Sequence, residues 1–339
     1  MSAVEVHDGF LRLRDGEQAA DFHLRWLRHN CDGDRHPQTG ERLVDSAELP
    51  DVLAVTDAVV DDGVLRVRWG HDGRVSRFPL PWLREHAYAI DRDVAPPPGD
   101  PRLLETSADD DILARLADRG AAVIRSRGGV PEDETEAWIA AFEQRGLRVI
   151  GTHFGRIEDL RTDNTTNANT DQLGYTDAAI GLHTDQPFLD EPPRYQLLQS
   201  IREGDGGDSL VADGLAAFRY LESVDAHAAE ILRTTPVRFH RKQKAFERIV
   251  DTPLVTWPDG VFRIRSSYFT LAPFKLPFER MEAWYRAVDR FTRIVRNPDH
   301  HYRFRLRPGD VLVYDNHRML HGRTAFRGAR WVRGVYFDR

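Results

Sequence analysis

The chain has 339 residues, of which 41% are hydrophobic and 30% are charged, as expected of a protein that folds around an apolar core. Its formal net charge of -7 argues against nucleic acid as a partner, and no apolar run approaches the ~18 residues needed to span a membrane. A single cysteine, Cys31, excludes an intrachain disulfide, and the lack of a secretory signal pattern at the N-terminus predicts a cytoplasmic protein.

The first 94 residues are expected to form a small β-rich domain. Within residues 64–69, Leu65, Val67 and Trp69 alternate with charged residues, which is the period of a half-buried strand. The proline-rich residues 95–103 interrupt regular structure and predict a linker. Residues 104–339 then form a second, larger domain.

The larger domain combines a few helices with many strands. Helices are predicted over residues 109–119, 131–145 and 277–296, and strands over 120–126, 195–201, 209–212, 261–269, 302–306, 311–314 and 331–337. In the last helix, helical spacing predicts core positions for Met281, Trp284, Tyr285, Val288, Phe291 and Val295. The pattern predicts a mainly β fold with flanking helices, built on a double-stranded β-helix of the jelly-roll or cupin kind.

Two histidines and one aspartate form the candidate metal site. His183 and Asp185 are two residues apart, so extended backbone places both side chains on one face. His321 lies far downstream and must come from another strand. Two imidazoles and a carboxylate can hold Fe(II) on one side and leave the other open. His317 is close in sequence, but its strand-like surroundings favour a hydrogen-bonding role.

An enzyme that uses iron and O2 also needs a source of electrons. The chain has no glycine fingerprint for a flavin or nicotinamide and no cysteine set for an iron–sulfur cluster. A 2-oxoacid could chelate iron, with its far carboxylate held by the guanidinium of Arg330. Arg330 shares strand parity with Tyr336, so both are expected to face one cavity, whereas Arg333 should point outward.

These residues belong to a larger set of motifs. The chain contains RWLRHNC (25–31), Trp69, PWL (81–83), YT (175–176), HTD (183–185), GGDS (206–209), PGD (308–310), DN (315–316), LHGR (320–323), and Arg330 followed by GVY (334–336). Over nearly its whole length it resembles the Fe(II)/2-oxoglutarate dioxygenases of the taurine dioxygenase superfamily, and most of all the γ-butyrobetaine hydroxylase branch.

The resemblance implies a double-stranded β-helix core and a small N-terminal domain. It implies that His183, Asp185 and His321 hold iron, that Arg330 holds 2-oxoglutarate, and that Ser209 lies in the cosubstrate region. The family's reaction uses O2 to convert 2-oxoglutarate to succinate and CO2 while a small molecule is hydroxylated. Because many members are homodimers, the resemblance also implies a homodimer.

The chain departs from the family at a structural zinc site of the N-terminal domain. The cysteine positions of that site read Cys31, Gly33 and His36, and the later histidine position reads Arg74. Thiolate ligation is largely lost, so we predict no structural zinc. An altered site that includes His36 and His71 is the alternative.

A second departure concerns the substrate. The branch surrounds a trimethylammonium group with aromatic rings, and Tyr175, Tyr336 and Phe154 match three cage positions. The fourth position, usually tryptophan, falls at Glu158, and a family asparagine becomes Gln172. A carboxylate favours a cation that donates hydrogen bonds, which predicts a small cationic or zwitterionic amine such as an amino acid, betaine or aminophosphonate. The alternative is that Glu158 lies on a loop surface.

Three other functions remain open at this stage. The same site could catalyse desaturation or cyclisation, because substrate position relative to iron decides the outcome. A catalytically silent binding protein could share the fold, although it would not need the full set of three ligands and Arg330. A cupin-type dioxygenase or isomerase would do without 2-oxoglutarate.

Overall fold

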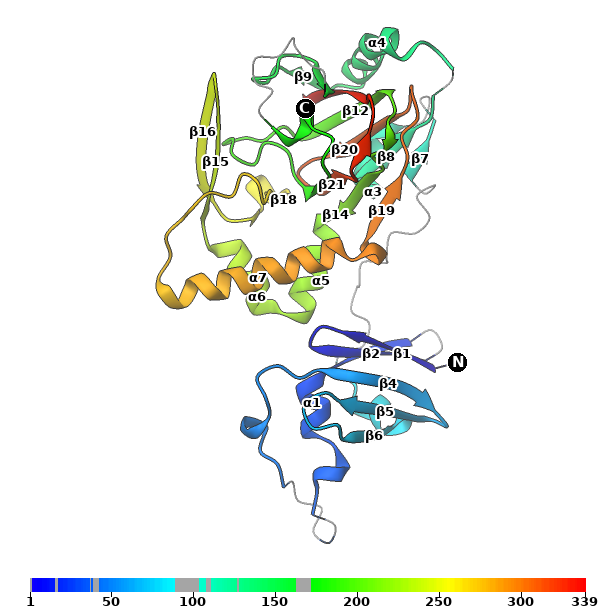
Figure 1. The fold of residues 1–339 in the computed structure, drawn as a ribbon, viewed down its shortest axis with the longest axis vertical. Helices are drawn as coiled ribbons and strands as arrows, with labels where there is room; N and C mark the ends of the chain where they lie inside the picture. The colour runs from blue at the N-terminus through cyan, green and yellow to red at the C-terminus, as the bar shows by residue number, and fades with distance from the viewer. Residues whose placement is uncertain are drawn as a thin grey trace. The chain divides into compact units, whose positions relative to one another are not determined.

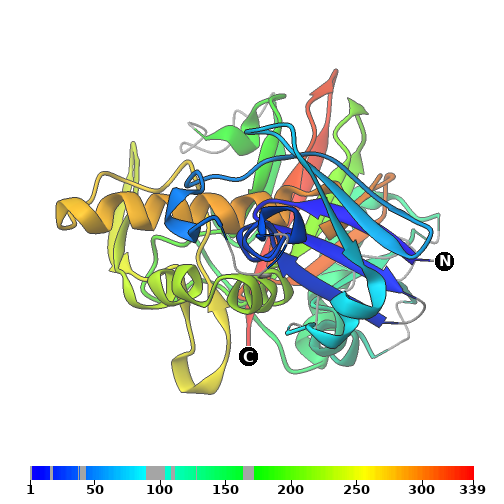
Figure 2. The ribbon, with the colours of Figure 1, turned by 90° about the horizontal axis from the view of Figure 1, so that it is seen from below.

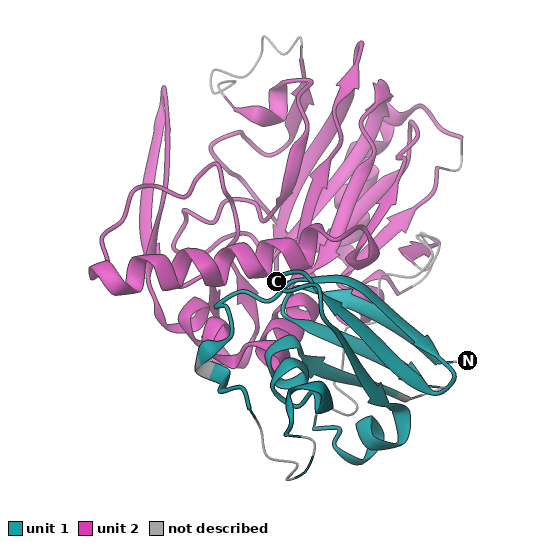
Figure 3. Ribbon diagram, turned by 60° about the horizontal axis from the view of Figure 1, so that its bottom comes forward, with its two compact units in different colours: residues 1–93 teal, residues 94–339 magenta. Residues whose placement is uncertain are grey.

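The computed structural model describes residues 2–15, 18–36, 38, 43–88, 104–107, 111–126, 128–162 and 172–339. The chain divides into two compact units, residues 1–93 and 94–339 (Figure 3). The predicted linker, residues 95–103, lies outside the described residues. None of the described helices combines the length and the apolar composition that a membrane span requires.

The first unit contains two antiparallel sheets, each of three strands in its described part. The alternating residues 64–69 form the central strand of the second sheet, and Leu65, Val67 and Trp69 are fully buried, which confirms the predicted strand. The elements are β1 (Ser2–His7), β2 (Phe10–Asp15), β3 (Gln18–His23), α1 (Leu24–His29), β4 (Val55–Asp61), β5 (Val64–Trp69), β6 (Val75–Pro79) and α2 (Leu80–Glu85).

The second unit is built on two sheets that pack face to face (Figure 1). The larger sheet has the order β10-β23-β12-β20-β8-β7, with β9 added beside β23, and the smaller has the order β11-β21-β14-β19. Their strands are β7 (Glu105–Thr106), β8 (Ala121–Ile124), β9 (Arg148–Ile150), β10 (Glu158–Arg161), β11 (Ile180–His183), β12 (Tyr195–Arg202), β14 (Ser209–Asp213), β19 (His301–Phe304), β20 (Val311–Asp315), β21 (Met319–Arg323) and β23 (Trp331–Asp338).

Strand alternation separates the layers of this unit. In β20, Leu312 and Tyr314 face the smaller sheet, where they pack with Val211 and Met319. Val311 and its neighbours on the opposite face pack against α3 (Ile112–Arg119) and α4 (Pro131–Gln144). This arrangement is the jelly-roll core with flanking helices that the strand pattern predicts.

Three further helices cover the smaller sheet. Helices α5 (Gly214–Val224), α6 (Ala226–Thr234) and α7 (Phe278–Arg296) lie side by side in Figure 2 and share one apolar core with Leu182 and Leu320 of that sheet. Two-stranded pairs complete the unit: β13 (Asp205–Gly206) with β22 (Phe326–Arg327), β15 (Val237–Gln243) with β16 (Phe246–Thr252), and β17 (Val255–Thr256) with β18 (Arg263–Ile264).

Two local predictions are wrong. The strand predicted over residues 261–269 is reduced to Arg263–Ile264. After Ile264 the backbone forms single hydrogen bonds with other segments instead of a continuous strand pairing. For example, the amide of Thr184 donates to the carbonyl of Ser266 at 2.7 Å. Tyr285, predicted in the core, is 47% exposed, because it follows Trp284 directly and so lies about 100° around α7 from the buried face.

Candidate metal centre and active site

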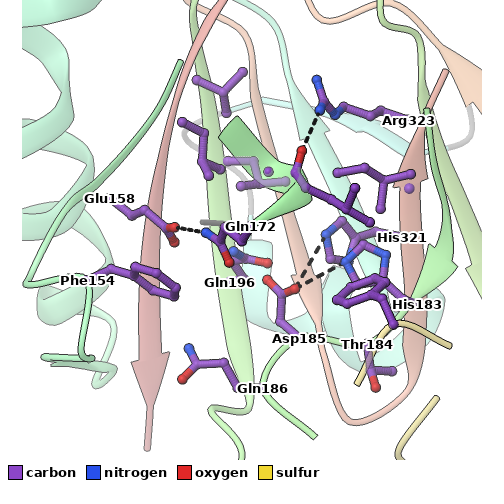
Figure 4. A pocket seen from close by; sticks show the side chains of 18 of the residues that line it. Phe154, Glu158, Gln172, His183, Thr184, Asp185, Gln186, Gln196, His321 and Arg323 are labelled. Carbon is purple, nitrogen blue, oxygen red and sulfur yellow. Dashed lines mark hydrogen bonds and ion pairs between the residues drawn. The ribbon is translucent and has the colours of Figure 1, made fainter. Parts of the chain in front are cut away.

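The three predicted metal ligands come together at one end of the smaller sheet. His183 ends β11 and pairs in register with His321 of β21, while Asp185 lies two residues beyond. The Oδ1 atom of Asp185 is 3.3 Å from Nε2 of His183 and 3.9 Å from Nε2 of His321, and Figure 4 shows its carboxylate facing both imidazoles. In the described part of the chain, this is the only group of three such side chains that could hold a metal ion.

Hydrogen bonds fix the orientation of these side chains. The Nδ1–H of His183 donates to the carbonyl of Gly181 at 2.9 Å, which leaves the Nε2 lone pair directed at Asp185. The backbone amide of Asp185 donates to Oδ1 of Asn316 at 2.8 Å, and the hydroxyl of Tyr336 donates to Oδ2 of Asp185 at 2.7 Å. Asp185 is therefore held in position both through its backbone amide and through Oδ2 of its carboxylate.

The protonation states of this group suit a metal ion. Burial and then the neighbouring His183 lower the pKa of His321 to about 3, so its imidazole is neutral. Burial opposes ionisation of Asp185, but the adjacent imidazoles and the hydroxyl of Tyr336 hold its pKa below the usual range. Two neutral imidazoles and one ionised carboxylate are the donor set that Fe(II) takes in a facial triad. His317 is engaged elsewhere, since its Nε2 lies 2.9 Å from the carbonyl of Pro192.

The triad lies in the wall of a cavity that encloses about 1040 Å³ of space between atoms, open solvent at its mouth included. Figure 4 shows the carboxylate of Asp185 between two groups of side chains, with Glu158 and Phe154 on one side and Arg323 on the other. The two ends of the cavity carry different ionisable groups.

One end is cationic. Arg330 and Arg323 both line it, and neither forms an ion pair with any described residue, whereas nearby Arg305 is paired with Asp208. Burial, then Arg323 and Arg305, lower the pKa of Arg330 to about 9, so the guanidinium remains charged at neutral pH. A buried cation without a counter-ion is costly, and this end of the cavity therefore suits an anionic group.

The predicted parity of the last strand is confirmed by the lining of the cavity. Arg330 and Tyr336 line it, whereas Arg333 turns to the opposite face and donates to Asp159 at 3.1 Å. Ser209 lies on β14 opposite Arg323 and also lines the cavity.

The second glycine of the GGDS motif, Gly207, leaves no room for a side chain. Gly207 has a φ of +78°, and a Cβ atom there would lie 3.3 Å from Nε of Arg330 and 3.3 Å from Cβ of Phe326. Without a side chain, the loop packs closely on Arg330, whose guanidinium also lies 5.5 Å from the centre of the Phe326 ring. The loop and this ring therefore fix the position of the arginine.

The other end of the cavity holds a carboxyl group. Glu158 lies on β10 opposite Gly334, lines the cavity and is only 4% exposed, so the alternative of a loop surface is wrong. The side-chain amide of Gln172 donates to its Oε1 at 2.8 Å, and the hydroxyl of Tyr175 donates to the same oxygen at 3.0 Å. Burial, then Asp185, raise the pKa of Glu158 to about 8. Its second oxygen, Oε2, accepts no hydrogen bond from a described residue.

Not all of the remaining predicted substrate residues line the cavity. Phe154, Gln172 and Tyr336 line the cavity. Tyr175 is buried behind Glu158 and is not among the described residues that line it. Sequence reasoning missed Gln186 and other lining residues; Gln186 directly follows the HTD motif, whereas Arg241 and Phe188 carried no signal in the sequence.

Ion pairs occupy the region of the first unit that matches the family's zinc site. The buried carboxylate of Asp34 pairs with Arg28, and its Oδ1 is 2.8 Å from Nη1 of Arg74. Arg28 also lies 3.0 Å from Asp72. Arg74, at the position of the family's later histidine, therefore contributes charge rather than a metal ligand. The absence of a structural zinc stays a prediction.

Known proteins resemble this chain over most of its length. The family model described as taurine catabolism dioxygenase TauD, TfdA family, matches residues 93–336. A gamma-butyrobetaine dioxygenase of Pseudomonas sp. (strain AK-1) is 31% identical over 347 residues, which cover 95% of this chain and 88% of the relative. A trimethyllysine dioxygenase of Meyerozyma guilliermondii is 25% identical over 372 residues, which cover 96% of this chain and 89% of the relative.

A solved structure shares its fold with about two thirds of this chain. The non-heme iron oxygenase OrfP, in complex with Fe, succinate and (3S)-hydroxy-L-Arg, superposes with a TM-score of 0.51 at 21% identity. The match covers 67% of this chain and 79% of that one.

Proposed function

The chain belongs to the taurine catabolism dioxygenase TauD, TfdA family, and from this premise we propose how its cavity is used. The protein is an Fe(II)- and 2-oxoglutarate-dependent dioxygenase that releases succinate and CO2. Its substrate is a small cationic or zwitterionic amine, hydroxylated at a C–H bond. The observation that carries the proposal is the meeting of His183, Asp185 and His321 in one cavity with Arg330, which forms no ion pair with a described residue.

Each residue of the cosubstrate half has a defined task. His183, Asp185 and His321 hold Fe(II), and Asn316 and Tyr336 keep the Asp185 carboxylate in position. When bound together with 2-oxoglutarate and O2, the iron supplies the oxidant that removes an unactivated hydrogen atom. Arg330 binds the far carboxylate of 2-oxoglutarate, beside Ser209.

Glu158 is the residue that selects the substrate's cation. Gln172 and Tyr175 both donate to Oε1 and so orient the carboxylate, while Oε2 remains open to a ligand. A primary or secondary ammonium group can donate a hydrogen bond to Oε2, and a trimethylammonium group cannot. The ring of Phe154 adds a cation–π surface at the same end. An amine that carries N–H bonds is therefore preferred over γ-butyrobetaine.

The proposed function is tested by a screen of amines that measures 2-oxoglutarate consumption and succinate formation with Fe(II) and ascorbate. We expect some succinate without substrate and strong stimulation by a small amine, whose product gains one oxygen atom. A product that instead lacks two hydrogen atoms identifies desaturation or cyclisation. If no condition gives iron-dependent succinate, the proposed function fails.

Replacement of Glu158 by glutamine should weaken binding of primary ammonium compounds. A suitable matched pair is 4-aminobutyrate and γ-butyrobetaine, which differ only in methylation. Because the acceptor of the ammonium hydrogen bond loses its negative charge, we expect KM for 4-aminobutyrate to rise roughly tenfold to a hundredfold, with a smaller change for γ-butyrobetaine. KM and kcat from succinate formation measure both effects.

The control for this variant is Glu136→Gln, which alters an exposed carboxylate that pairs with Arg156. It should leave both KM values unchanged. Ordinary turnover of γ-butyrobetaine by the wild-type protein, with amino acids and aminophosphonates inert, would contradict the assignment of Glu158.

The raised pKa of Glu158, about 8, also gives substrate binding a pH dependence of predictable sign. Below that pH the free protein holds the carboxyl protonated, and a bound ammonium ion favours the carboxylate, so binding releases a proton. Affinity for 4-aminobutyrate should therefore rise by up to about tenfold per pH unit as the pH approaches 8. Calorimetry in buffers of different ionisation heat measures the released proton, and a flat wild-type profile would refute the prediction.

We further propose that the chain acts as a cytoplasmic homodimer and that residues 1–94 form a γ-butyrobetaine hydroxylase-like N-terminal domain. The support is the resemblance of residues 25–31 and 81–83 to that branch, together with the low cysteine content. Light scattering of the full chain measures the oligomeric state, and a monomer at micromolar concentration would contradict the dimer.

A further inference from the structure

Gln186 has an unusual backbone for its position in the cavity. It directly follows Asp185, lines the cavity and is only 5% exposed. Its φ is +53°, in the left-handed region that residues with side chains rarely adopt. The other described non-glycine residues with positive φ are Asp62, in a turn, and Asp259, within the short 3-10 helix Pro258–Gly260. Both are aspartates, which tolerate this conformation better than glutamine does. Such strain persists where a functional site requires it.

The side-chain amide of Gln186 is buried without a hydrogen-bond partner. Neither its Oε1 nor its Nε2 contacts a donor or acceptor among the described residues. Gln199, another buried glutamine, is paired at both polar atoms: its Nε2 donates to the carbonyl of Pro131 at 2.8 Å, and its Oε1 accepts from Thr135 at 2.7 Å. Because an unpaired buried amide is costly, the amide of Gln186 points to a ligand that completes its hydrogen bonds.

The surroundings of Gln186 indicate the charge of that ligand. In Figure 4 the residue lies on the side of Asp185 away from Arg323, with its amide directed toward the side of Phe154. The half-buried Arg241 of β15 also lines the cavity, and its charge offsets a small part of the rise that burial causes in the pKa of Glu158. The substrate end therefore contains a carboxylate, a guanidinium and an amide with unused donors.

Resting on the proposed function, we propose that Gln186 and Arg241 bind the acidic group of the substrate. The Nε2–H of Gln186 donates to an acid oxygen, and the guanidinium of Arg241 supplies the opposite charge. Gln172 cannot serve in the same way, because its amide already donates to Glu158. The substrate class is thus an amino acid with a free ammonium group on Glu158 and a carboxylate or similar acid at Gln186.

The test compares probes that differ only in the acidic group. L-Lysine is paired with 1,5-diaminopentane, and 4-aminobutyrate with propylamine. Binding is measured by ligand-observed NMR without iron or 2-oxoglutarate, and KM is measured by stimulated succinate formation. The wild-type protein should prefer the acid-bearing member of each pair. Substrate-independent succinate formation by the wild-type protein tests the proposed function separately.

Two substitutions test Gln186: one makes its side chain apolar, and the other makes it negatively charged. Gln186→Leu removes the amide and should weaken binding of both acid-bearing probes by roughly tenfold to a hundredfold, with the simple amines unaffected. Gln186→Glu places a carboxylate next to the acidic group of the probe. It should therefore weaken binding of the acid-bearing probes further and strengthen binding of 1,5-diaminopentane.

Gln199→Leu is the matched control, because it removes a buried glutamine amide that does not line the cavity. It should lower Tm and leave the preference for acid-bearing probes unchanged. Gln186→Leu should keep or raise Tm, since it removes two unpaired buried atoms. The proposal is overturned if the wild-type protein binds no acid-bearing probe or shows no preference for one, or if Gln186→Leu lowers Tm while the preference stays.

Discussion

Replacement of Asp185 by alanine is expected to abolish iron-dependent succinate formation and to weaken Fe(II) binding by more than about a hundredfold. Loss of even an outer partner of a metal ligand costs 10–100-fold, and Asp185 is the charged member of the ligand set. The variant retains only the imidazoles of His183 and His321 as ligands. Anaerobic titration with Fe(II) and an assay for succinate measure the two effects.

Asp251→Ala is the control for this prediction. Asp251 forms an exposed ion pair with Arg238 on the β15–β16 pair, and it does not line the cavity. Its removal should change neither iron affinity nor succinate formation. Wild-type iron affinity in Asp185→Ala would show that the metal binds elsewhere.

Replacement of Arg330 by alanine is expected to raise KM for 2-oxoglutarate by about a hundredfold or more. Truncating one partner of a buried charge pair costs at least 2 kcal/mol, and often about 3–5 kcal/mol. Fe(II) affinity should change little, because Arg330 is not one of the ligands. Arg330→Lys should recover only part of the loss, because lysine keeps the charge without the two-pronged grip. Steady-state kinetics with varied 2-oxoglutarate, together with iron titration, separate these effects.

Arg333→Ala provides the control on the same strand. Its guanidinium lies on the opposite face and donates to Asp159 and to Thr135, so KM for 2-oxoglutarate should stay at the wild-type value. Full activity of Arg330→Ala would instead support a cupin-type enzyme that does not use 2-oxoglutarate.

In the proposed function, the different chemistry of the two ends lets one cavity accept two carboxylate-bearing molecules. Arg330 and Arg323 make one end cationic, which is why we propose it as the site of the dicarboxylate cosubstrate. At the other end, the proposed task of Glu158 is to bind the substrate's ammonium group, whose charge favours the ionised form of this carboxyl. Asp185 of the triad lies between Glu158 and Arg323, an arrangement that fits a separate approach of the two molecules to the metal (Figure 4).

The parts of the site that the sequence predicts are those governed by local periodicity. The spacing of His183 and Asp185 places both on one side of extended backbone, and the structure brings them together. Alternation along the last strand correctly separates Arg330 and Tyr336 from Arg333. These inferences need only the period of a strand, which residues a few positions apart determine.

The parts that the sequence does not predict depend on distant partners. Tyr175 was expected at the cavity surface, but its hydroxyl is engaged with Glu158 because β10 pairs with β23 and buries that carboxyl. Arg241 reaches the cavity from the β15–β16 pair, whose placement no local pattern fixes. The left-handed backbone of Gln186 likewise has no sequence signature, since glutamine is not a residue that favours it.

Two helices were missed although the sequence contains a signal for them. Asp213 and Asp225 cap α5 and α6, and their side chains accept hydrogen bonds from the amides of Ala216 and Ala228. An aspartate directly before an alanine-rich apolar run is typical of a helix N-terminus. The two helices are short and follow each other directly within residues 213–234, so each shows too few turns for a clear helical period of apolar residues. That period is clear in longer helices such as α7.

The most direct test of the central claim is a crystal structure of the protein with Fe(II) and 2-oxoglutarate, grown without O2 and measured at the iron absorption edge. We predict one anomalous peak per chain, bound by Nε2 of His183, Oδ1 of Asp185 and the imidazole of His321, with the far carboxylate of 2-oxoglutarate on Arg330. A metal peak away from these three side chains, or a 2-oxoglutarate carboxylate away from Arg330, would contradict the account.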